Sequence, residues 1–167
     1  MANPNRHFQT TDPATQHALI AAQPLATLVL SHQGALHVNH VPLYLDPARG
    51  PHGTLIGHVA RANALWPLLL QQAVAVFHGP QAYVSPSWYP SKSLDGKQVP
   101  TWNYATVHAH GTLSAVDDAV RLRAILHTLT QAHEAHRAAP WGINDAPPDY
   151  IDKMLRAIVG IELAVER

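Results

Sequence analysis

FHGPQAYVSPSWYP (residues 77–90), followed by VPTWNY (residues 99–104), is the stretch around which the chain is organised. Residues 77–104 hold six of the eleven aromatic side chains and four prolines, and each proline removes a backbone donor that a continuous helix needs. A polar loop with a turn at Asp95-Gly96 separates the two blocks. Rigid rings among hydroxyls and lysines suit the wall of a pocket for a planar, charged ligand. They equally suit a barrel corner packed by aromatic side chains.

The totals describe a compact globular protein. The 167 residues predict one domain, spanning 1–167, and suffice to bury a core without disulfides. Eleven basic and eleven acidic residues cancel, so no global field favours nucleic acid or an anionic membrane. The absence of cysteine excludes disulfides and thiolate catalysis. No apolar run approaches the ~20 residues of a membrane span and the start is polar, so a cytoplasmic location is expected.

Hydrophobic alternation and turn signals predict a mainly β fold of six or seven strands, mostly antiparallel. Strands are expected at residues 25–30, 36–44, 54–59, 74–78, 81–85, 99–115 and 159–165. Helices are expected at 13–23, from the 60–66 junction to about 73, at 118–137 and at 149–157. Such a pattern is typical of a small closed or split β-barrel with flanking helices on its outside.

The junction after the strand at 54–59 predicts an anion site. A strand that runs into a helix N-terminus presents unpaired backbone N–H groups, and the helix dipole favours an anion there. Arg61 offers a two-pronged donor and Asn63 offers a cap or a further donor, which together describe a seat for a phosphate. The alternative interpretation is an exposed arginine beside an ordinary asparagine cap.

Other kinds of site find less support in the sequence. Thirteen histidines invite a metal site, but the pairs at 108/110 and 133/136 do not bring three or four ligands together, so no metal is predicted. Ser85 and Ser87 lack the Gly-x-Ser-x-Gly elbow of a serine hydrolase. No Gly-x-Gly-x-x-Gly segment joins a strand to a helix, which argues against a dinucleotide fold.

The two blocks within 77–104 resemble the PaiB family of FMN-binding negative transcriptional regulators, and the similarity extends over nearly the whole chain. The supporting motifs are PLATL (24–28), HVPL (40–43), GHVARAN (57–63), HAHG (108–111) and AIVGI (157–161). The resemblance implies an FMN-binding split β-barrel, similar to pyridoxamine-phosphate oxidases and flavin reductases. It also implies a homodimer with the flavin in a groove between the subunits. One departure is that the family's basic Ser-Gln-Asn tail does not follow Glu166-Arg167.

The resemblance also implies which residues bind the cofactor. The candidates for the FMN phosphate are His58, Arg61 and Asn63. The candidates flanking the isoalloxazine or the ribityl chain, from the same or the partner subunit, are Ser85, Ser87, Trp88, Tyr89 and Lys92. The opposite wall is assigned to Thr101, Trp102 and Asn103, and a further candidate is His40.

The function expected from the resemblance is that of a dimeric, FMN-binding, PaiB-like transcriptional regulator. The sequence shows neither a helix-turn-helix with a basic recognition face nor a phosphate-neutralising stripe, so an effect on genes is expected through a partner or by sensing flavin or a metabolite. The alternative is a flavin-dependent oxidoreductase that acts on a small molecule with FMN at the subunit interface. A third possibility is a dimeric barrel that no longer holds flavin.

Overall fold

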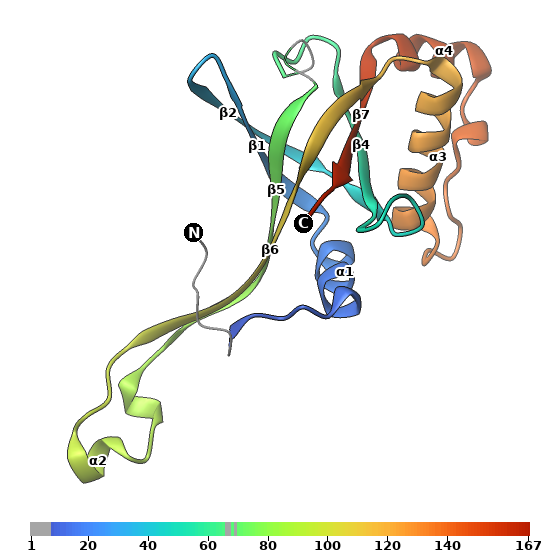
Figure 1. Ribbon diagram of the computed structural model, residues 1–167. Coiled ribbons are helices and arrows are strands. Elements are labelled where there is room, and N and C mark those ends of the chain that lie inside the picture. The colour runs from blue at the N-terminus through green and yellow to red at the C-terminus, as the bar shows by residue number, and fades with distance from the viewer. Residues whose placement is uncertain (1–7, 66–67, 69) are drawn as a thin grey trace.

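A computed structural model describes residues 8–65, 68 and 70–167, and Figure 1 shows their arrangement. Its body is one sheet in the order β2-β1-β5-β6-β7-β4-β3. The strands are β1 (Leu25–His32), β2 (Ala35–Pro42), β3 (Tyr44–Asp46), β4 (Thr54–Ala60), β5 (Gln71–Val84), β6 (Thr101–Val116) and β7 (Ile158–Val165). Every paired neighbour in this sheet is antiparallel, which confirms the predicted mainly β architecture.

The main core lies on the inner face of the curled sheet, where alternate residues of each strand are apolar. Leu28, Phe77 and Leu163 are fully buried there, because side chains two apart on a strand share a face. β4 approaches the end of β2 closely at Gly57, where an added Cβ would lie 2.9 Å from the carbonyl oxygen of Pro42. The absence of a side chain at Gly57 therefore lets the sheet curl toward a barrel.

Helices cover only part of the sheet. The helical segments are α1 (Pro13–Ala22), α2 (Lys92–Asp95), α3 (Ala119–Glu134), α4 (Pro148–Arg156) and the 3-10 turns η3 (Pro86–Trp88) and η4 (Ile143–Asp145). Asp118 precedes α3, and its carboxylate accepts a hydrogen bond from the backbone N–H of Arg121 and so caps the helix. Its Ile125 and Leu129 pack on the outer face of β4 and β6 (Figure 1). No helix among the described residues is long and apolar enough to cross a membrane.

The helix predicted to end near residue 73 is wrong in its described part. Residues 61–65 form turns, Leu68 lies in a 3-10 turn, and β5 already begins at Gln71. Leu70 has a φ of 73°, and its N–H donates to the carbonyl oxygen of Leu113 on β6, so tertiary pairing replaces helical bonds here. Residues 66, 67 and 69 lie outside the described part. Without this helix, the proposed helix N-terminus for an anion is absent from the described chain.

β5 differs from prediction in a second way, because the strands expected at 74–78 and 81–85 are one strand. Its pairing with β6 continues across the Gly79-Pro80 break by a register shift between His78 and Gln81. A bulge accommodates the proline, which cannot donate to the ladder, without ending the strand.

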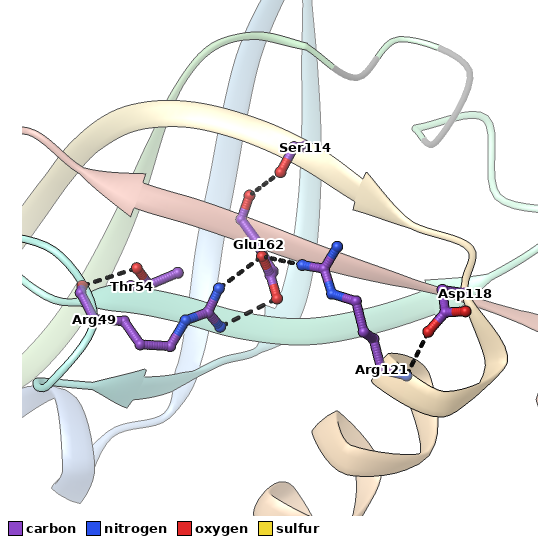
Figure 2. Close-up of polar contacts among 6 residues, drawn as sticks. All are labelled: Arg49, Thr54, Ser114, Asp118, Arg121 and Glu162. Carbon is purple, nitrogen blue, oxygen red and sulfur yellow. Dashed lines mark hydrogen bonds and ion pairs between the residues drawn. The ribbon is translucent and has the colours of Figure 1, made fainter.

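A buried carboxylate on β7 joins α3 to the loop before β4 (Figure 2). Arg49 donates two hydrogen bonds of 3.1 and 2.9 Å to Glu162, and Arg121 donates one of 2.9 Å. The hydroxyl of Thr54 donates to the carbonyl oxygen of Arg49 and fixes the loop. Burial opposes the ionisation of Glu162, but the hydrogen bonds and charges of the two arginines outweigh it and hold the pKa of its carboxyl below its ordinary value.

Glu162→Gln is expected to lower the free energy of unfolding by about 2 kcal/mol at neutral pH, because charged hydrogen bonds to both arginines are lost. A carboxyl whose pKa is lowered by folding stabilises the protein above its unfolded pKa, and this contribution fades as pH falls through the folded pKa. The difference between variant and wild type should therefore shrink below about pH 4.5 in urea titrations. An equal difference at neutral and acid pH would contradict a role for the charge.

Candidate functional site

The stretch that the sequence singled out forms a hairpin arm that projects from the body (Figure 1). We define the arm as residues 78–106. β5 and β6 stay paired from His78–Thr106 out to Val84–Thr101, which extends the arm by roughly 20 Å at the usual rise per residue. The tip carries η3 and α2. The arm therefore presents its side chains away from the core of its own chain.

The arm tip gathers hydroxyls, a cation and aromatic rings. Lys92 Nζ donates to the hydroxyl of Ser87 at 3.1 Å, and the backbone N–H of Ser87 donates to the hydroxyl of Ser85 at 3.2 Å. Trp88 is 67% exposed and Tyr89 is 41% exposed. The five candidates from this loop thus lie in one short segment, where the prolines on both sides restrict the backbone.

The two faces of the arm differ in character. Tyr83 and Trp102 stand opposite each other on one face with ring centroids 6.2 Å apart, and the indole N–H of Trp102 donates to Gln81 at 3.1 Å. Thr101 and Asn103 are its immediate neighbours in β6 and point to the other face. The structure therefore places the three candidates Thr101, Trp102 and Asn103 on two surfaces.

The aromatic face of the arm continues into the body as a sheet surface that the described helices leave uncovered. We call this surface, which is the outer side of β2, β1, β5 and β6, the open face. One row across its strands runs through His40, Thr27, Val76 and His108, and a second runs through Val38, Val29, Val74 and His110. Its exposed large apolar side chains are Leu25, Leu36, Val38, Tyr83, Trp102 and Tyr104.

The phosphate candidates lie on β4 and in the turn that follows it. The guanidinium of Arg61 pairs with Asp117 and donates to the carbonyl oxygens of Arg156 and Ile158 at 3.0 and 3.2 Å. The hydrogen bond from Arg61 to Asp117 holds the pKa of the Asp117 carboxyl below its ordinary value. Arg61 therefore clamps the ends of β4, β6 and α4 together in the single chain.

Asn63 and His58 are held differently. The Asn63 side chain donates to Asn39 at 3.1 Å and accepts from the backbone N–H of Leu65 at 2.8 Å, which shapes the turn after β4. His58 shares the outer face of β4 with Ile56, and its buried Nδ1 has no hydrogen-bond partner within the described chain. Burial lowers the pKa of its imidazole. Its neutral ring thus keeps one nitrogen available for a polar ligand or a water.

The candidates fall into a body group and an arm group, which one chain does not bring together. The body group has four members: His58, Arg61 and Asn63 at the end of β4, and His40 on the open face. The other eight lie on the arm, whose side-chain hydrogen bonds given above all stay within the arm. Asp117 and Asn39 escaped prediction because their partners are 56 and 24 residues away, and no local pattern records such pairs.

Comparison with known proteins adds a family and a fold. The family model described as "Putative FMN-binding domain" matches residues 3–167. The Protease synthase and sporulation protein PAI 2 of Bacillus subtilis is 29% identical over an alignment of 163 residues, and the match covers 96% of this chain and 75% of that protein. An uncharacterized protein of Saccharomyces cerevisiae is 32% identical over an alignment of 154 residues, and the match covers 79% of this chain and 90% of that one.

The fold is shared with flavoproteins of known structure. The FAD and heme binding protein from Mycobacterium smegmatis superposes with a TM-score of 0.70 at 18% identity, covering 93% of this chain and 67% of that one. Identity this low supports the split-barrel fold and nothing about the ligand of this chain.

Proposed function

The chain belongs to the family of FMN-binding domains that matches residues 3–167, and from this premise we propose that it works as a homodimer that binds FMN between its two copies. The resemblance predicted from residues 77–104 and the mainly β, split-barrel fold are confirmed. FMN, the cofactor that the sequence predicted, is the one that the family's description names.

The observation that carries the proposal is the separation of the candidate residues into an arm and a body. A lone chain exposes the rings of Trp102 and Tyr104 by 54% and 65%, together with the apolar side chains of the open face. Exposed apolar surfaces of this extent are typical of interaction sites. A second copy with the same arm and the same open face would cover these side chains and would place the arm of one copy beside the body of the other. Closed two-fold pairing is the commonest form of self-association.

The chemistry of both groups fits FMN. The phosphate needs cations and hydrogen-bond donors, which Arg61 of the body and the hydrogen-bonded pair Lys92 and Ser87 of an arm tip can supply. The isoalloxazine needs a flat apolar surface, and the exposed ring of Trp88 or Tyr89 offers one. When bound, FMN would supply one- or two-electron redox chemistry. The residues of this chain would hold its phosphate, orient the ring and exclude water.

Arg61→Ala is expected to weaken FMN binding by about 1.5–3 kcal/mol, the scale of a hydrogen bond to a charged group. The matched control is Asp117→Asn, which removes the carboxylate that competes with a phosphate for Arg61 and leaves the guanidinium in place. That control should bind FMN at least as tightly as the wild type. Flavin fluorescence titration of both variants measures the two affinities.

Two outcomes of this pair would remove Arg61 from the site. Unchanged affinity in Arg61→Ala would leave the residue with its role as a clamp alone. Equal weakening in both variants would assign the effect to loss of the clamp.

We also propose that any regulatory role runs through the bound flavin or a small molecule rather than through direct contact with DNA. The formal net charge of the chain is zero, and the described helices α1, α3 and α4 bury apolar side chains against the rest of the chain. A gel shift with promoter DNA at low salt is expected to show no complex, and a salt-sensitive complex would contradict this.

The first experiment on the proposal is a visible absorption spectrum of the purified protein mixed with FMN and then desalted. Retained flavin absorbance with about one FMN per chain is expected. A protein that stays colourless after this treatment would overturn FMN binding. Steady oxidation of NADPH by the loaded protein would favour the oxidoreductase instead of the regulator.

A further inference from the structure

Four histidines lie on the open face. His40 is on β2, His78 on β5, and His108 and His110 on β6, where the last two rings have centroids 6.4 Å apart. The other residues of the two rows are uncharged. In the first row Thr27 and Val76 lie between His40 and His108, and in the second row His110 follows three valines. Histidine is therefore the charge-changing residue of this surface near neutral pH.

Few other charged groups reach this part of the face. β1 contributes only uncharged residues there, which are Leu25, Thr27, Val29 and Ser31. The end of the chain adds Glu166, which accepts from the hydroxyl of Thr112 at 2.9 Å, and Arg167, whose carbonyl oxygen accepts from the backbone of His110 at 3.0 Å. Among the described residues of this part of the face, Glu166 is therefore outnumbered by positive charges once the histidines are protonated.

We propose that protonation of the adjacent pair His108 and His110 drives the two copies apart, so that the dimer and its FMN are lost as pH falls from about 7.5 to about 5.5. The inference rests on the proposed function, because it needs the open face to be the surface of association. In the dimer each imidazole leaves water and meets a face that bears the same histidines. A charged ring there loses hydration and is repelled, whereas a neutral ring packs without that cost.

The direction follows from linkage. A base whose pKa is lower in the dimer than in the free chain favours association at high pH. Association weakens as pH falls through the pKa of the free chain toward the lower pKa in the dimer. In the single chain burial, Arg167 and His108 lower the pKa of the His110 imidazole, and a further loss of water on association acts in the same direction. If one histidine in each copy loses one pKa unit on association, the dimer dissociation constant rises about 100-fold once both are protonated.

The test is sedimentation velocity at about pH 7.5 and about pH 5.5, with circular dichroism to show that the chain stays folded. Wild type is expected to be a dimer at the higher pH and to dissociate at the lower one. The double variant His108→Gln/His110→Gln should stay dimeric at both. The matched control, His133→Gln/His136→Gln, changes two histidines at and just beyond the end of α3, off the open face, and should dissociate like the wild type.

The outcomes separate this inference from the proposal beneath it. A wild type that is monomeric at both pH values overturns the dimer and the inference together. A wild type that is dimeric at both pH values overturns the inference alone. Acid dissociation that persists unchanged in His108→Gln/His110→Gln overturns the assignment to these two residues.

Discussion

Val38→Glu is expected to yield a folded monomer that no longer retains FMN. Val38 lies in the second row of the open face and is 55% exposed in the single chain, so a glutamate there stays hydrated as long as the chain is alone. Association would bury that carboxylate on both copies without a partner, and burying an unpaired charge costs several kcal/mol. The dissociation constant of the dimer should rise by at least about 100-fold, measured by light scattering and sedimentation.

The matched control is Val120→Glu. Val120 is 78% exposed and lies on α3, away from the open face. This variant should remain dimeric and keep its flavin. A Val38→Glu protein that stays dimeric would show that association uses another surface.

Gly111→Ala is expected to destabilise the fold by more than about 3 kcal/mol, as a severe backbone clash does. An added Cβ at Gly111 would lie 1.9 Å from the carbonyl oxygen of Ala164 on the neighbouring strand β7. A backbone oxygen cannot swing aside as a flexible side chain can. β6 and β7 must therefore separate locally, at the centre of the sheet. Urea unfolding or soluble yield measures the loss.

The same substitution at Gly142 serves as its control. A Cβ at Gly142 would find its nearest atom, a carboxylate oxygen of Asp145, at 3.7 Å, which is ordinary contact. Gly142→Ala should change the free energy of unfolding by less than about 1 kcal/mol. A Gly111→Ala protein as stable as this control would mean that β6 and β7 are not in the register described.

Much of the fold could be predicted because its signals are local. The helices expected at 13–23 and 118–137 are present as α1 and α3, and Asp12 and Asp118 accept hydrogen bonds from the first turn of each. The strand expected at 99–115 is present as β6, because its alternating sequence suits side chains that point to opposite faces in turn.

The region after β4 could not be predicted because distant partners decide it. The apolar run near residue 70 suits a helix, but Leu70 donates to Leu113 and the chain enters β5. The sequence around Arg61 likewise predicts a helix start that binds an anion. In the structure its guanidinium instead bonds to Asp117, 56 residues away. Local propensity is overridden wherever such long-range bonds satisfy the backbone and the charges.

The arrangement of the candidate site could not be predicted from the sequence. The aromatic stretch suggests a pocket wall or a barrel corner, whereas it forms an arm that carries Trp88 and Lys92 away from His58 and Arg61 in the body (Figure 1). That division follows from the long pairing of β5 with β6. From this division we propose that each FMN lies between the arm of one copy and the body of the other.

A heterodimer of two defective chains tests this claim most directly. One chain carries Arg61→Ala with an intact arm, and the other carries Trp88→Ala/Lys92→Ala with an intact body. Two different affinity tags isolate the mixed dimer, in which one site combines both defects and the other combines both intact halves. Each parent is expected to bind FMN weakly, while the mixed dimer is expected to bind about one FMN per two chains with wild-type affinity. A mixed dimer as weak as its parents would show that arm and body do not act across the two copies.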